Sequence, residues 1–592
     1  MYFYSRALLL TGISASFLGL SNSTKAGEEL VYDPIARPDL ICGKGQSRSM
    51  ALPGNFQTAL ASIQMAPVPA RDRSVPLIAG LDKVVLKVTT SSSSAQQYFN
   101  QGLALSYGFN HDGAIRSFRA AQALDPECAM CFWGEAFAHG PNINAAMDTA
   151  ANAKAVAAAQ RAMTLRDKAT QWEQDLIGAI ALRYTSSDAD RPTLDAKYAT
   201  AMQQVAADHP GNDDVAVLAA EAIMNTRPWD YWESDRRTPK GEIGTAVNMV
   251  EGVLSRNPNH PQAIHLYIHL MEASSTPEKA EASADRLAKP LMPGAGHLVH
   301  MPGHLYHVLG RYRDSIRANV AAAKADEAWL AQTDEAGIYR YGYYPHNVHF
   351  IVTGAQLGGD KATALDQSAR LRGILGVDVA MALPWVQVIY AAPYFAHAQF
   401  SSSAEILAQP APDERLPYAT AMWHYSRAVA SALKNDAVGT EREIAAMRKF
   451  RMEANFKSMV DAGIPAPDLI ELAEEVAFGR IAYAQRRFSD SAAHYTRAVA
   501  IEDRIPYMEP PFWYYPVRQS LGAAQLAMGD PHAARQSFMA ALARAPNNGW
   551  ALYGLAESQR RMKDRPAMRG TRAALERAWL GTDRTALQLI RL

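Results

Sequence analysis

The sequence predicts an all-α protein, an α-solenoid in which two-helix repeats stack into a superhelix behind an irregular N-terminal segment. From about residue 92 onward Ala, Leu, Glu, Arg and Gln dominate, and apolar residues recur at helical spacing. Strand-like alternation is nearly absent from this region. Two segments near its opposite ends, each about 34 residues long, repeat one pattern of small, aromatic and proline residues, which is typical of a repeat array.

The length and composition agree with a large, ordered repeat protein. A chain of 592 residues is longer than one compact core usually serves. Hydrophobic residues make up 48% and charged residues 20%, which argues against extensive disorder. The 59 basic and 59 acidic side chains balance, so nothing in the net charge indicates nucleic acid or an anionic membrane as the main partner.

The first 26 residues are typical of a secretion signal. Arg6 supplies the positive charge, residues 7–20 are mostly apolar, and Thr24 and Ala26 are small residues spaced as at a cleavage site. The alternative is a membrane anchor, but a bilayer span needs about 20 apolar residues. We therefore predict cleavage after Ala26, a periplasmic or secreted protein, and no membrane span afterwards. Residues 27–92, rich in Pro, Gly and Ser, are expected to be irregular.

The repeat pattern places a bulky residue at unit position 4, small residues at positions 8 and 20, an aromatic residue at 24, Ala at 27 and Pro at 32. The unit starting at Ala95 supplies Tyr98, Gly102, Ala114, Phe118, Ala121 and Pro126. The unit starting at Tyr515 supplies Gly522, Ala534, Phe538, Ala541 and Pro546. In this pattern the chain resembles the tetratricopeptide repeat (TPR) family. Small residues let the two helices approach closely, aromatic residues fill the space between units, and Pro ends the second helix.

Weaker units fall between these two, and the resemblance covers residues 92–592. We divide them into N-terminal repeats at 93–210, central His-rich repeats at 211–370 and C-terminal repeats at 371–592. Long insertions at 141–170, 185–195 and 226–246 are more than a simple adaptor needs, and they could wall off a pocket. The resemblance implies that the first helix of each unit lines a concave groove, which would bind a protein, a peptide or a small molecule.

Histidine is concentrated in the central repeats. Nine of the 16 histidines lie between residues 260 and 349, where an even spread would place about two. They are His260, His265, His269, His297, His300, His304, His307, His346 and His349.

The repeat register brings several of these side chains to one side of the groove. Positions 5 and 9 hold His265 and His269 in the unit starting at Pro261, and His300 and His304 in the unit starting at Gly296. Such i, i+4 pairs share one helix face. Positions 2 and 5 of the next unit hold His346 and His349, and an earlier unit has Glu221 at position 9. These seven residues are the predicted metal ligands.

The chemistry of this set favours a transition metal. Imidazole with at most one carboxylate suits copper, zinc or iron rather than calcium or magnesium. Glu221 or Glu272 would orient a ligand or act as a general base. Two alternatives remain open: a polar groove for an organic ligand, and structural hydrogen bonding. Pro302 is a departure from the ideal register, because the helix could kink or start there and leave His297 and His300 on a loop.

Two functions from different classes follow. The first is an exported TPR-repeat binding protein whose groove holds a His-rich metal site. The second is a metal-dependent enzyme, an oxidoreductase or hydrolase, built on the same solenoid. The sequence contains no GxSxG, GxxxxGK[ST] or HExxH motif, so a catalyst would be the metal itself. Cys128 and Cys131 have CxxC spacing and could close a small disulfide in an oxidising compartment.

Overall fold

The computed structural model describes residues 75–185, 190–289, 291–333, 335, 337–582, 584 and 587–591. The predicted signal peptide, residues 1–26, and most of the predicted irregular segment lie outside these ranges. The described part of that segment, residues 75–92, contains neither helix nor strand.

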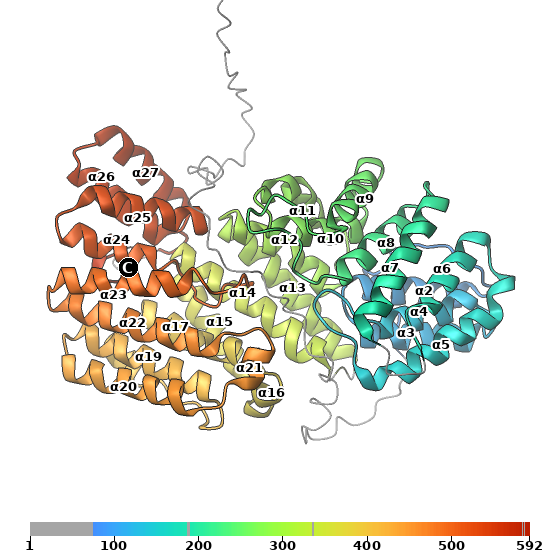
Figure 1. The fold of residues 1–592 in the computed structure, drawn as a ribbon, viewed down its shortest axis with the longest axis horizontal. Helices are drawn as coiled ribbons and strands as arrows, with labels where there is room; N and C mark the ends of the chain where they lie inside the picture. The colour runs from blue at the N-terminus through green and yellow to red at the C-terminus, as the bar shows by residue number, and fades with distance from the viewer. Residues whose placement is uncertain are drawn as a thin grey trace, which may run out of the picture.

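The predicted fold class, an all-α solenoid with TPR-like repeats, is confirmed: the described residues hold many helices, two isolated β-bridges and no β-strand. Figure 1 shows the helices following one another from the N-terminal repeats on the right to the C-terminal repeats on the left. The N-terminal repeats comprise α2 (Ser93–Tyr107), α3 (His111–Leu124), α4 (Ala129–His139), α5 (Asn152–Leu165), α6 (Gln171–Ala181), α7 (Arg191–Asp208), α8 (Asp213–Asn225) and α9 (Ile243–Arg256).

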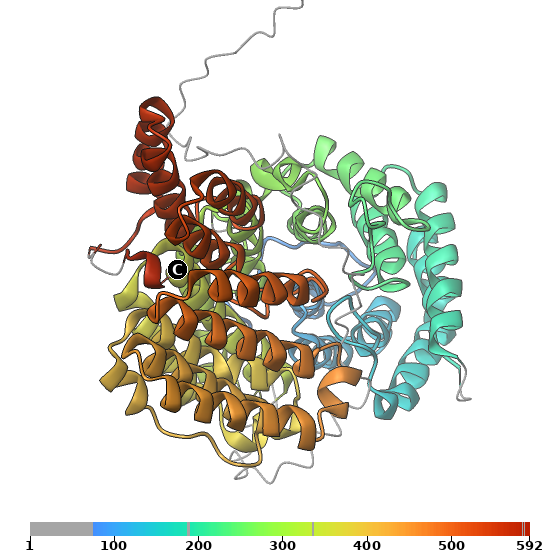
Figure 2. The same cartoon turned by 60° about the vertical axis from the view of Figure 1, so that its left-hand side comes forward.

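The stack continues through the histidine-rich repeats into the C-terminal half, and Figure 2 shows that it curves. The central helices are α10 (Pro261–Glu272), α11 (Glu281–Leu287), α12 (Gly296–Val308), α13 (Tyr312–Gln332), α14 (Tyr344–Gly358) and α15 (Lys361–Ile374). The C-terminal helices are α16 (Val377–Ala382), α17 (Val386–Phe400), α18 (Ser403–Leu407), α19 (Pro417–Leu433), α20 (Ala437–Glu453), α21 (Lys457–Asp461), α22 (Ala466–Ala484), α23 (Phe488–Glu502), α24 (Arg518–Ala527), α25 (Pro531–Arg544), α26 (Gly549–Arg561) and α27 (Arg565–Ala578).

Short helical turns complete the described chain. Four are 3₁₀ turns: η3 (Thr149–Ala151), η4 (Arg166–Lys168), η5 (Pro277–Ala280) and η7 (Leu589–Arg591). The fifth, η6 (Tyr339–Tyr343), is a π-helical turn that leads directly into α14. Turns of this kind are frequent beside functional sites.

Near each end of the array, neighbouring helices pack through contacts between glycines and an aromatic ring, as the repeat pattern predicts. A Cβ atom added to Gly102 would lie 2.7 Å from the ring of Phe118, and one added to Gly134 would lie 2.3 Å from it. The Phe118 ring therefore occupies the space that a larger residue in α2 or α4 would need. Near the C-terminus the ring of Phe538 excludes a Cβ atom from Gly554 in the same way. The small residues are thus required by close helix packing.

The helices that carry the histidines begin where the repeat register places them. Two of the expected starts, Pro261 and Gly296, are the first residues of α10 and α12. Pro302 lies inside α12, and the helix continues on both sides of it. His297 and His300 consequently lie on a helix and not on the loop that a start at Pro302 would produce.

Two large hydrophobic cores meet at the histidine-bearing helices. One is built mainly by α2–α12 and the other mainly by α14–α24. No helix among the described residues is long and apolar enough to cross a membrane. Cys128 and Cys131 form a disulfide at the start of α4, where both side chains are buried.

Candidate metal centre

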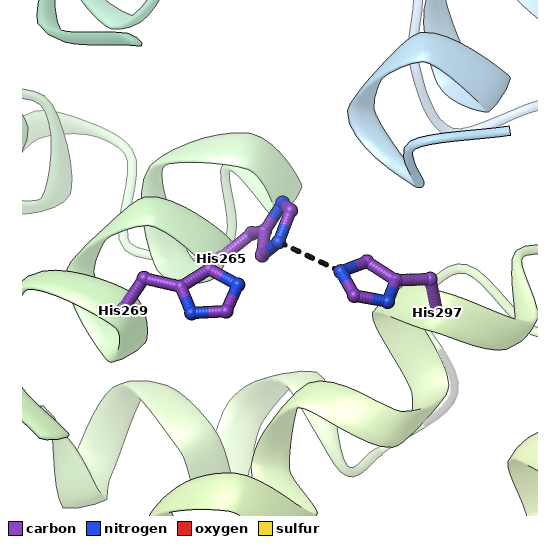
Figure 3. Close-up of side chains that lie close together, drawn as sticks. All are labelled: His265, His269 and His297. Atoms are coloured by element: carbon purple, nitrogen blue, oxygen red, sulfur yellow. Dashed lines mark hydrogen bonds between the residues drawn. The ribbon is translucent and has the colours of Figure 1, made fainter. Parts of the chain in front are cut away.

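Three consecutive first helices of the repeats direct imidazole side chains into the interior between the two cores. Figure 3 shows two of these helices, with His265 and His269 on one and His297 on the other, and the three rings face one another. We call these three residues the first imidazole group. Their ligand atoms all lie within 4.8 Å of one another, and all three side chains are buried.

A second imidazole group lies next to the first. It consists of His300 and His304 from α12 and His346 from α14, and its ligand atoms also lie within 4.8 Å of one another. The rings of the two groups come close at two places: the ring centroids are 5.5 Å apart for His269 and His304, and 5.8 Å apart for His297 and His300. The two groups therefore form one continuous cluster.

The spacing of the ring nitrogens within each group matches shared metal ligation. The Nε2 atoms of His265 and His297 are 3.2 Å apart and those of His304 and His346 are 3.4 Å apart, and in this structure each pair forms a hydrogen bond. Two nitrogens bonded to one tetrahedral ion at about 2.0–2.1 Å lie roughly 3.3 Å from each other. One such pair occurs in each group.

Oxygen acceptors behind the rings fix the tautomers of four imidazoles. In each case the Nδ1 atom donates to a buried side-chain oxygen, so Nε2 is the atom through which the unprotonated ring would bind a metal. The donor–acceptor pairs are His265 with Gln262 at 2.9 Å, His269 with Glu272 at 2.7 Å, His300 with Asn319 at 2.5 Å, and His304 with Glu272 at 2.9 Å. Within the part of the chain that the structure describes, the Nε2 atoms of His269 and His300 make no hydrogen bond.

Electrostatics keeps most of the cluster in the neutral form that binds metals. Burial, reinforced by neighbouring histidines, lowers the pKa well below its usual value for His265, His269, His297, His300 and His346. These imidazoles are therefore unprotonated at neutral pH.

His304 is the exception within the cluster. Burial lowers its pKa, but the opposing charges of Glu509 and Glu272 outweigh that effect and raise it to about 10. Both carboxylates form ion pairs with the Nδ1 atom of His304. A metal ion at the second imidazole group would therefore have to displace a proton from this residue.

Two predicted ligands lie outside both groups. The Nε2 atom of His349 is 3.0 Å from the hydroxyl group of Tyr514, one helical turn beyond His346. Glu221 is separated from the imidazoles by Gln262. Its Oε2 atom accepts a hydrogen bond of 3.0 Å from Gln262, and the Oε1 atom of Gln262 accepts the hydrogen bond from His265. The structure thus brings together five of the seven predicted residues and adds His297, which lies one residue after the start of α12.

Glu509 is a site residue that sequence reasoning missed. It lies in the segment between α23 and α24, far along the chain from α12, and reaches His304 only through the tertiary fold. No local motif marks this position. Asn319 was missed for a similar reason: it belongs to the second helix of its unit, which the repeat pattern assigns to the outer face.

A cavity of about 1270 Å³ reaches the second imidazole group through His304. The insertion at 226–246 forms one wall of this cavity, as its length suggested, and the segment between α23 and α24 forms another. The aromatic side chains that line the cavity include Trp229, Trp232, Tyr312, Phe350, Tyr507 and Phe512. Glu272 and Glu509 also face the cavity.

Comparisons with known proteins leave the family open. No protein-family model matches the chain, and no curated protein matches it. A structure of a human IFIT1 dimer with m7Gppp-AAAA is similar over 88% of this chain and 98% of that chain, at 12% sequence identity and a TM-score of 0.29. Naa15/Naa10 bound to HypK-THB is similar over 82% of this chain and 75% of that one, at 10% identity and a TM-score of 0.19. Similarity at this level carries no information about a ligand.

Proposed function

We propose that this TPR-like protein binds transition-metal ions, one at each imidazole group. The observation that carries the proposal is the pair of Nε2–Nε2 separations, 3.2 Å and 3.4 Å, in a buried cluster whose Nδ1 atoms are held by oxygens. Imidazole ligands suit copper, zinc and iron, and three imidazoles leave a coordination position open for a further ligand.

The decisive experiment is metal analysis of the purified full chain. We expect two equivalents of metal in the native protein and loss of both in the variant His265→Ala/His300→Ala, which removes one ligand from each group. The matched control is His424→Ala/His494→Ala, because these two imidazoles lie outside the cluster and each pairs with one glutamate. Circular dichroism would establish that both variants remain helical. Unchanged metal content in the first variant would refute the proposal.

Export is part of the same proposal and rests on residues 1–26. An exported location would also suit the Cys128–Cys131 disulfide, since disulfides persist in oxidising compartments. N-terminal sequencing of protein recovered from the periplasm or medium should begin near Gly27. Recovery of the chain with Met1 intact would contradict this assignment.

A metal-dependent enzyme is the second candidate, and the cavity at His304 favours it. A three-histidine site beside a large cavity would let a small molecule or a peptide segment reach the ion. We would measure oxygen consumption by copper- or iron-loaded protein with a reductant, and ester hydrolysis by zinc-loaded protein. Turnover above that of the metal-free protein supports catalysis. Its absence with all three metals leaves metal binding as the function.

A further inference from the structure

One carboxylate spans the two imidazole groups. The Oε1 atom of Glu272 accepts a hydrogen bond of 2.7 Å from His269, and its Oε2 atom accepts one of 2.9 Å from His304. Glu272 is completely buried at the C-terminal end of α10. Glu272 therefore orients one imidazole of each group.

The two groups lie close enough for two ions to influence each other. Ring centroids approach to 5.5 Å across the boundary between the groups. With metal–nitrogen bonds of about 2.0–2.1 Å, ions at the two groups would lie within roughly 10 Å of each other. Two divalent ions would bring a charge of about +4 into a buried region. The carboxylates of Glu272 and Glu509 lie beside His304 and offset part of that charge.

The groups differ in their access to the cavity. None of the first group's three histidines lines it, and Phe109 packs against His265 and His297 with ring centroids 4.7 Å and 5.0 Å apart. The second group does reach the cavity, through His304. A ligand arriving from the cavity would therefore meet the second group.

Resting on the proposed metal binding, we propose that the two ions form one dinuclear centre with unequal roles. The ion at the first imidazole group is closed and structural. The ion at the second group faces the cavity and accepts an exogenous small anion. Glu272 connects the two ions by orienting one imidazole of each group.

The experiment loads the metal-free full chain with two equivalents of Cu(II) and records electron paramagnetic resonance spectra. We expect dipolar broadening and a half-field signal in the native protein. Two variants separate the ions: His297→Ala should lose the closed ion, and His346→Ala should lose the cavity-facing ion. Each variant should bind one equivalent and give a sharp mononuclear spectrum.

Azide then tests the unequal access. We expect an azide-to-copper absorption band in the native protein and in His297→Ala, and none in His346→Ala. Azide binding by His346→Ala, or two independent sharp spectra in the native protein, would overturn the inference while leaving metal binding intact. Failure of the native protein to bind copper, zinc or iron would instead overturn the proposed function itself. If either variant fails to fold, the native spectrum and an azide stoichiometry of one per two coppers decide the question.

Discussion

Asn319 offers a sharp test of the metal centre because it supports a proposed ligand without touching the ion. Its Oδ1 atom accepts the Nδ1 hydrogen bond of His300 at 2.5 Å, and its Nδ2 atom donates to the carbonyl of Ser315 at 2.8 Å. The variant Asn319→Leu keeps a similar volume and removes both interactions. The Nδ1–H group of His300 would then be buried without an acceptor, and its ring would no longer be held in the tautomer that ligates through Nε2.

The expected effect has two measurable parts. Loss of such a supporting hydrogen bond typically weakens metal binding 10–100-fold, or about 1.4–2.7 kcal/mol. The unpaired buried donor should also lower the free energy of unfolding of the metal-free protein by about 1–3 kcal/mol. Competition titration with a chromophoric chelator would measure the affinity of each ion. We expect the second imidazole group to lose affinity while the first group keeps its own.

Two further variants separate orientation from general destabilisation. Asn319→Asp restores an oxygen acceptor for His300 and should recover the affinity for the second ion. Asn548→Leu removes a buried asparagine that belongs to neither imidazole group, caps α26 and donates to Gln519, so it should lower stability without changing metal affinity. Native affinity at the second group in Asn319→Leu would refute the argument that Asn319 orients a ligand.

Three other changes have defined outcomes. Burial raises the pKa of Glu221 to about 7, above the roughly 4.3 of an unfolded chain, so metal-free protein should lose stability as the pH rises from about 4.5 to 7. Glu221→Gln should remove about 3 kcal/mol of this change in the free energy of unfolding, measured by urea titration at a series of pH values. An unchanged pH dependence in the variant would contradict the role of Glu221. Gly134→Ala should lower the free energy of unfolding by about 1–3 kcal/mol, measured in thermal melts, because the added Cβ atom would overlap the ring of Phe118. The control Gly570→Ala, in open space on α27, should be neutral or stabilising. Arg236→Ala removes hydrogen bonds to the carbonyls at 273 and 274, so limited proteolysis should cut the 226–246 insertion faster; an unchanged cleavage rate would contradict this role.

The sequence was informative wherever packing is local and periodic. The repeat pattern gave the fold class, and the residues Pro261 and Gly296 mark the starts of α10 and α12. Because the i, i+4 spacing is a property of the helix itself, the pairs on these two helices share a face as predicted. On α14 only His346 lies in an imidazole group, whereas the Nε2 atom of His349, three residues further along, is 3.0 Å from the hydroxyl group of Tyr514.

The remaining site features depend on tertiary structure that no local pattern encodes. Glu509 comes from an irregular segment between α23 and α24, and only the curvature of the array brings it to His304. Glu221 lies at a groove-facing register, but Gln262 fills the space between it and His265. The assignment of His297 to a ligand group required knowing that α12 runs uninterrupted through Pro302.

The contact between Glu509 and His304 changes the mechanics of the molecule. In a simple repeat array each unit contacts only its neighbours, so stability depends on the interfaces between adjacent units. Here the segment between α23 and α24 contacts two distant helices. Glu509 forms an ion pair with His304 of α12, and the hydroxyl group of Tyr514 lies 3.0 Å from the Nε2 atom of His349 in α14. The intervening helices are thus closed into a loop by contacts between residues far apart in the sequence. The ion pair at His304 therefore holds distant parts of the array together and also lies within the imidazole cluster.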